Sequence, residues 1–157
     1  MANSIYKTRT NYVHVTDEET FKEICRLGCT AELEPLTVIT ARDANGEDIY
    51  GFYAEGDIEG YILNDNGTIA DFNAEDFDNE RDWDRSFDRF VEDLKSVVAP
   101  DDALIITTIG SEKMRCLSAN SFVITHDEIK EINLSEIAKQ TAREMLGDES
   151  WTTKMWY

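Results

Sequence analysis

The chain has 157 residues, of which 15 are lysine or arginine and 33 are aspartate or glutamate, so its formal net charge is −18. Its length fits one domain over residues 1–157, and a hydrophobic content of 41% with three Trp, six Tyr and seven Phe supplies a core, which excludes a wholly disordered chain. The negative charge disfavours direct binding to nucleic acid or to an anionic membrane and favours basic partners.

The first elements predicted along the chain are a strand and a helix. Residues 11–15 alternate and are rich in side chains that favour β-structure, which predicts a strand. Thr16 and Glu19 form a capping-box pattern, with Thr16 at the N-cap position. We expect the helix that follows to end at Gly28 in a left-handed conformation. Its buried stripe is predicted to contain Phe21, Ile24, Cys25 and Leu27.

From Leu36 onward the hydrophobic period changes to two, which predicts short strands. The dipeptides Asn45-Gly46 and Asn66-Gly67 favour two-residue type I′ turns, because both positions of such a turn need positive φ. The result is an antiparallel meander of hairpins. Its strands are predicted near residues 36–42, 48–54, 58–63 and 68–72.

Apolar residues at helical spacing predict an amphipathic helix over residues 82–99, stopped by Pro100. Its predicted exposed side carries two parallel ladders at four-residue spacing. Such acids could imitate a row of phosphates, and the alternative is ordinary ion pairing within the helix. The acidic ladder is Glu80, Asp84, Asp88 and Glu92, the basic ladder is Arg81, Arg85 and Arg89, and the apolar stripe is Trp83, Phe87, Phe90, Val91, Leu94, Val97 and Val98.

The C-terminal part reads as short strands and a last helix. Strands are expected over residues 103–108, 114–117 and 122–124, with turns at Gly110 and around Asn120. Residues 125–128 repeat the capping-box pattern and are expected to open a short turn or strand that runs to Leu134. Ser135 is predicted to cap a helix that Gly147 ends. The apolar tail of Trp151, Met155, Trp156 and Tyr157 is expected to pack on the domain or to add an edge strand. The predicted fold class is α+β, an antiparallel sheet packed against about three helices.

No motif for chemistry is evident. A zinc site would need four donors, and Cys25, Cys29, Cys116, His14 and His126 have no recognisable ligand spacing. A calcium loop over residues 62–73 fails, because its first and last ligand positions hold isoleucine and asparagine. Nucleophile-elbow, phosphate-loop and zinc-protease motifs are missing from the sequence. We therefore expect no cofactor, no metal and no catalytic residue, and the interpretation leans away from an enzyme.

The odd number of cysteines fits reduced thiols better than a disulfide framework. No stretch approaches the roughly 20 apolar residues that cross a bilayer, and the first residues lack the apolar run of a signal peptide. We expect a cytoplasmic protein without a structural disulfide.

The negative charge is concentrated in the middle of the chain. Residues 43–93 carry 17 acids and three bases, and from Asp43 to Glu80 there are twelve acids and no lysine or arginine. Solvated surfaces normally mix the two signs, because interspersed charges relieve repulsion. A need for solubility explains the total charge, as in an acidic housekeeping domain, but it explains this clustering less well.

Residues 10–19 and 142–149 resemble uncharacterised small acidic proteins from accessory regions of phages and conjugative elements. The resemblance contains no catalytic motif, so it assigns no functional residue. It implies a context, because such regions are similar to those that encode inhibitors of restriction and CRISPR systems. Several of those inhibitors are acidic mimics of nucleic acid.

The sequence thus favours a non-enzymatic protein that binds a basic, nucleic-acid-binding surface of a partner protein such as a nuclease, as a nucleic-acid mimic. An alternative is a small hydrolase, or a domain that binds a divalent cation or another ligand with acidic pocket residues. The residues expected to contact the basic partner are Asp43, Glu47, Asp48, Glu55, Asp57, Glu59, Asp65, Asp71, Glu75, Asp76, Asp78, Glu80, Asp84 and Asp88.

Overall fold

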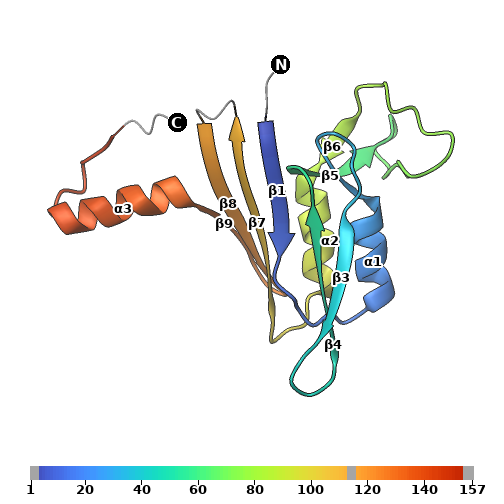
Figure 1. Ribbon diagram of the computed structural model, residues 1–157, viewed down its shortest axis with the longest axis horizontal. Helices are drawn as coiled ribbons and strands as arrows, with labels where there is room; N and C mark the ends of the chain where they lie inside the picture. Colours follow the sequence, from blue (N-terminus) through green and yellow to red (C-terminus); the bar gives the residue numbers. More distant parts are fainter. Residues whose placement is uncertain (1–3, 113–115, 154–157) are drawn as a thin grey trace.

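The computed structural model describes residues 4–112 and 116–153 (Figure 1). Nine strands and three helices follow one another along this part of the chain. In order they are β1 (Ser4–Thr10), α1 (Glu18–Leu27), β2 (Gly28–Thr30), β3 (Thr37–Arg42), β4 (Asp48–Ala54), β5 (Ile58–Leu63), β6 (Asp84–Ser86), α2 (Phe87–Val97), β7 (Ala103–Glu112), β8 (Cys116–Thr125), β9 (Ile129–Asn133) and α3 (Leu134–Leu146).

The strands form two antiparallel sheets. The larger sheet has six strands in the order β3-β4-β1-β7-β8-β9, and the smaller has three in the order β2-β5-β6. Strands that follow one another in the sequence pair as the hairpins β3–β4, β7–β8 and β8–β9. The first strand, β1, instead lies between β4 and β7 in the middle of the sheet. The predicted fold class, an α+β protein with an antiparallel sheet packed against helices, is confirmed.

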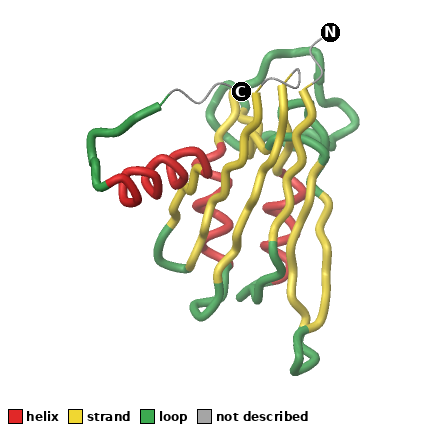
Figure 2. The backbone as a smooth tube through the Cα atoms, turned by 60° about the vertical axis from the view of Figure 1, so that its left-hand side comes forward, coloured by secondary structure: helices red, strands yellow, loops and turns green. Residues whose placement is uncertain are grey.

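One face of the large sheet is covered by α1 and α2, which lie behind the strands in Figure 2. The core between them contains side chains from both helices and from β4, β5, β7 and β8. Phe90 lies at its centre, with its ring centroid 5.4 Å from that of Tyr61 and 6.2 Å from that of Phe52. The stripe predicted for the first helix is confirmed at Phe21, Ile24 and Cys25, which are buried.

The opposite face of the large sheet and helix α3 carry most of the exposed apolar surface. α3 follows β9 directly, extends away from the sheet and buries no residue (Figure 1). No helix in the described ranges is long and apolar enough to cross a membrane. Exposed large apolar side chains of these two surfaces are Ile5, Tyr53, Ile105, Ile109, Leu117, Ile132, Leu134, Ile137, Met145 and Leu146.

The first strand lies earlier than predicted. β1 spans Ser4–Thr10, and residues 11–15 contribute only the isolated bridges of Val13 with Tyr50 and Val15 with Val98. The alternation of β1 was hidden because its buried positions include Thr8 and Thr10, which are polar. The helix cap is also shifted by one residue, since Asp17 and not Thr16 accepts the N–H of Thr20 (2.9 Å).

Both Asn-Gly turns differ from the predicted type I′. Positive φ occurs at Gly46 (82°) and Gly67 (76°) but not at the preceding asparagines. In the first turn Gly46 N–H donates to the Asp43 carbonyl (3.1 Å) and Asp43 N–H donates to the Glu47 carbonyl (2.9 Å), and residues 64–68 repeat this pattern. Each turn therefore needs left-handed backbone at glycine alone. The predicted strand over residues 68–72 is wrong, because this segment forms only the bridge of Leu63 with Ile69.

The predicted helix over residues 82–99 is shorter. Residues 84–86 form β6, Ser86 is the N-cap, and α2 begins at Phe87. The two ladders are consequently not on one helix, and the predicted ion pairing between them is wrong. Their arginines act elsewhere: Arg81 binds Asp65, Arg85 donates to the Ala31 carbonyl and Arg89 donates to the Gly67 carbonyl.

Gly110 and Asn120 lie inside β7 and β8 rather than in turns. Gly110 is required there because the ring of Tyr6 on β1 lies against it, within 2.0 Å of where a Cβ would stand. Residues 125–128 open a short turn and strand, as predicted: they form the β8–β9 turn, with Thr125 Oγ1 accepting the N–H of Glu128 (3.0 Å), and β9 follows.

The last helix is capped by Asn133 and not by Ser135, and it ends as predicted at Gly147 with φ 64°. Trp151 is half-buried, and its carbonyl accepts a hydrogen bond from Arg143 Nε (2.8 Å). The predicted placement of Met155, Trp156 and Tyr157 falls outside the described residues.

Gly28 has extended backbone (φ −81°, ψ 147°) and not the predicted left-handed conformation. Its lack of a side chain serves packing, because a Cβ would lie 2.7 Å from Phe90 Cε2 and 2.8 Å from Leu36 Cδ1. We therefore expect Gly28→Ala to lower the free energy of unfolding by about 1–3 kcal/mol through overpacking, measured by urea denaturation. Phe90→Leu should cost less in the Gly28→Ala background than in the wild type; strictly additive losses would contradict this explanation.

Candidate functional site

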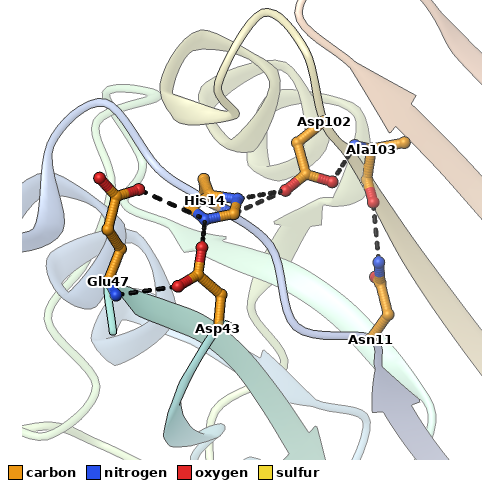
Figure 3. A network of polar contacts seen from close by, with 6 residues as sticks. All are labelled: Asn11, His14, Asp43, Glu47, Asp102 and Ala103. Carbon is orange, nitrogen blue, oxygen red and sulfur yellow. Dashed lines mark hydrogen bonds and ion pairs between the residues drawn. The ribbon is translucent and has the colours of Figure 1, made fainter. Parts of the chain in front are cut away.

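Polar side chains from three distant parts of the sequence meet around His14 (Figure 3). His14 lies in the segment between β1 and α1, and this segment is anchored on both sides. Val13 exchanges backbone hydrogen bonds with Tyr50 (2.8 and 2.9 Å), and the His14 carbonyl accepts the N–H of Ala99 (3.0 Å). Val13 is buried, so alternation along the chain directs His14 toward the surface.

Both ring nitrogens of His14 contact carboxylates. Nδ1 lies 2.9 Å from Asp102 Oδ2, and the same oxygen accepts the backbone N–H of His14 at 2.9 Å. On the other side of the ring, Nε2 lies 3.0 Å from Asp43 Oδ2 and 3.8 Å from Glu47 Oε2. The imidazole therefore joins the loop after α2 to the β3–β4 hairpin.

The two aspartates are held by backbone donors as well as by the histidine. Asp43 Oδ1 accepts the N–H groups of Asn45 (2.8 Å) and Glu47 (2.9 Å), which leaves its Oδ2 directed at His14. Asp102 Oδ1 accepts the N–H of Ala103 (2.8 Å). Glu47 is the most exposed member, since 71% of its side chain reaches solvent against 17% for Asp43.

Asn11 holds the backbone segment that leads from β1 to His14. Its Nδ2 donates to the Ala103 carbonyl (2.8 Å; Figure 3). Its Oδ1 accepts the N–H of Ile105 (2.7 Å), so the side chain continues the pairing of β1 with β7. The segment that leads to His14 is thereby tied to the strand that follows Asp102.

The electrostatics of the cluster favour a charged imidazole. Hydrogen bonds to Asp102 and then to Asp43 raise the pKa of His14 above its ordinary value of 6.5. The N–H of Glu47, followed by the His14 ring, lowers the pKa of Asp43. Burial opposes ionisation of Asp102, but the donors from His14 and Ala103 outweigh it and lower the pKa of that carboxyl. Below the raised pKa, one cation is thus surrounded by three carboxylates.

Sequence reasoning missed this cluster. It treated His14 as a strand residue between two valines, assigned Asp43 and Glu47 to partner binding, and did not single out Asp102. The asparagine-glycine turn signal did mark the Asp43 hairpin. No local pattern connects Asp102 to His14, because the two are 88 residues apart.

The fourteen acids predicted to bind a partner are divided between two ends of the molecule. Asp43, Glu47 and Asp48 lie at the β3–β4 hairpin tip, the lowest point in Figure 1. The others lie at the opposite end, on β5, β6, the loop over residues 64–83 and the adjoining ends of β4 and α2. We call this second group the loop-end acids: Glu55, Asp57, Glu59, Asp65, Asp71, Glu75, Asp76, Asp78, Glu80, Asp84 and Asp88.

Basic side chains neutralise some of these acids. Glu55 pairs with Lys7 (3.0 Å), Asp71 with Arg26 (2.9 Å), Asp65 with Arg81, and on the hairpin Asp48 with Arg42 (3.2 Å). The rest of the loop-end acids form no ion pair within residues 4–112 and 116–153. These unpaired acids are Asp57, Glu59, Glu75, Asp76, Asp78, Glu80, Asp84 and Asp88.

The loop that carries many of them packs its aromatic side chains on a small core that it shares with β2 and β5. The ring of Phe77 stacks on Trp83 with centroids 4.9 Å apart, and the guanidinium of Arg81 lies 4.2 Å from the Trp83 ring centre. Trp83 Nε1 donates to the Asp78 carbonyl (2.6 Å), which closes the loop. Glu75, Asp76, Asp78 and Glu80 are all exposed around this core.

Comparisons of the chain with family models, with curated proteins and with solved structures find no match, so the site is interpreted from its own geometry.

The His14 cluster predicts a pH dependence of stability. A folded-state pKa above 6.5 means that protonated His14 stabilises the fold fully below 6.5 and that this stabilisation is lost as the pH rises through the folded value. Urea midpoints of the metal-free protein from about pH 5 to about pH 9 should therefore fall on the alkaline side. His14→Gln should flatten that fall, whereas His126→Gln, in the exposed β8–β9 turn, should leave it in place. An unchanged profile in His14→Gln would show that protonation of His14 does not stabilise the fold.

Proposed function

We propose that this protein binds a basic, nucleic-acid-binding surface of a partner protein through its loop-end acids. The observation that carries the proposal is the charge of residues 55–88, which hold twelve acids and two arginines, a net charge of −10. Eight of these acids are unpaired loop-end acids. Carboxylates without an internal ion pair are available to cations of another molecule.

The loop-end acids repel one another. Binding of a cationic surface is favoured because it would relieve this repulsion. Partial burial, and then the nearby carboxylates of Glu59 and Glu32, raise the pKa of Asp57. A partner that supplies lysine or arginine would relieve this repulsion and accelerate encounter through long-range attraction. The stacked rings of Phe77 and Trp83 support recognition further, because a loop whose backbone is already held loses less conformational entropy on binding.

The chemistry of the partner follows from the sign and density of this charge. Proteins that bind nucleic acid place lysine and arginine where phosphates lie. The resemblance of residues 10–19 and 142–149 to accessory proteins of mobile elements supports an inhibitor of a defence nuclease, of the anti-restriction or anti-CRISPR type, acting in the cytoplasm. We confine the proposed contact to the loop end, because the hairpin acids lie at the far end of the molecule (Figure 1).

Neutralising the exposed loop quartet tests this proposal. We expect Glu75→Gln, Asp76→Asn, Asp78→Asn and Glu80→Gln together to abolish capture of nucleic-acid-binding proteins from a bacterial lysate. The wild-type protein should release them at about 0.5 M salt, where the Debye length is only about 3–5 Å. Duplex DNA should displace the same proteins, because it competes for the same basic surface.

The matched control removes the same amount of charge elsewhere. Asp127→Asn, Glu128→Gln, Glu144→Gln and Glu149→Gln change exposed acids of the β8–β9 turn, α3 and the segment after it. This variant should keep the wild-type capture. Equal loss in both variants, or capture that neither salt nor DNA affects, would refute the proposed interface.

A further inference from the structure

We propose that His14, Asp43 and Glu47 form a binding site for one divalent transition-metal ion of the Zn²⁺ class. Nε2 of His14 and one carboxylate oxygen from each acid lie within 4.8 Å of one another. All three side chains reach solvent, so an ion can enter without unfolding the protein. The site lies at the hairpin tip, opposite the loop-end acids, and does not depend on the proposed partner binding.

The spacing of the donor atoms suits a metal. Two ligands at the usual bond lengths of a tetrahedral zinc ion lie about 3.4 Å apart. Nε2 of His14 already stands 3.0 Å from Asp43 Oδ2 and 3.8 Å from Glu47 Oε2. Small side-chain movements would therefore bring all three donors to one ion. Three protein ligands leave a further position for water.

Asp102 orients the histidine for this role from the opposite side of the ring. Its Oδ2 lies 2.9 Å from Nδ1, the nitrogen that faces away from the hairpin, and also accepts the His14 backbone N–H. A metal-binding histidine almost always donates its second ring N–H to a carboxylate, carbonyl or water in this way. With Nδ1 as the donor, Nε2 offers its lone pair to the ion, and the proton between Nε2 and Asp43 leaves to solvent.

The donor set selects among metals. An imidazole nitrogen suits Zn²⁺, Co²⁺ and Ni²⁺ better than Mg²⁺ or Ca²⁺, which take oxygen ligands. Asp43 is ready for binding, because its Oδ1 is engaged by the hairpin N–H groups and its Oδ2 is directed at the site. Glu47 is largely exposed and can complete the set from outside.

The test titrates Zn²⁺ into the chelator-treated full-length protein by calorimetry, with Co²⁺ as a coloured probe. We expect saturable binding of one ion. His14→Gln and Asp43→Asn should each weaken it more than about 10-fold, and Glu47→Gln should weaken it less. Asp102→Asn should weaken it about 10–100-fold although Asp102 is not a ligand. Asp48→Asn, a neighbouring hairpin acid paired with Arg42, is the matched control and should bind as the wild type does.

A second measurement avoids variants that alter the fold. In the wild-type protein, ¹⁵N spectra of the histidine rings should show Zn²⁺ shifting Nε2 of His14 while Nδ1 keeps its proton. Binding that His14→Gln leaves unchanged, a spectrum in which His14 does not respond, or no saturable binding would each overturn the proposal. Loss of partner capture by the loop quartet variant has no bearing on it, so the two proposals fail separately.

Discussion

The pairing of β1 with two neighbours holds the large sheet together. β1 pairs with β7 from Ser4 to Thr10 and with β4 at Thr8 and Arg9, so it joins the β3–β4 hairpin to the β7–β8–β9 strands. Its buried threonines are satisfied: Thr8 Oγ1 donates to the Gly56 carbonyl (2.9 Å), and Thr10 Oγ1 accepts the N–H of Phe52 (2.9 Å). Without this strand the two hairpin systems would share no backbone hydrogen bonds in the large sheet.

The way in which β1 ends determines where His14 lies. Beyond Thr10 the chain leaves the ladder at Gly51, where a Cβ would approach the Asn11 carbonyl oxygen to 2.6 Å, and it rejoins β4 at the bridge of Val13 with Tyr50. A departure of this kind re-aims the side chains that follow, as a bulge does. It turns His14 toward Asp43 on one side and Asp102 on the other. The polar cluster is thus a consequence of sheet topology.

Fold and charge are largely independent in this protein. The core is built from apolar and aromatic contacts around Phe90, while no acid of the described residues is buried. Only some of the charge is balanced locally, since the arginines near the loop are shared between ion pairs and carbonyl contacts. The hairpin and loop ends therefore have different electrostatic characters: a carboxylate cluster around one histidine, and a broad field of unpaired acids.

Elements that depend on local sequence patterns were predicted correctly, and features that depend on contacts between distant residues were not. β4 and β5 have the predicted bounds, because alternation along a half-buried strand is a local signal. β1 was missed because threonine and tyrosine occupy its inward positions, and Gly110 was misread because only the Tyr6 ring across the sheet explains it. The exposed acids were visible from composition. The His14 cluster was not, because contacts between residues 14, 43 and 102 exist only after the sheet has formed.

The last described residue that packs against the main core is Ile129, and α3 follows β9 without contributing to that core. The main core is therefore complete without the final helix. Because none of its side chains is buried, substitutions on this helix cost the rest of the fold little stability. The sequence of α3 is therefore not constrained by packing of the hydrophobic core, and it can change in response to the contacts that the helix makes with other molecules.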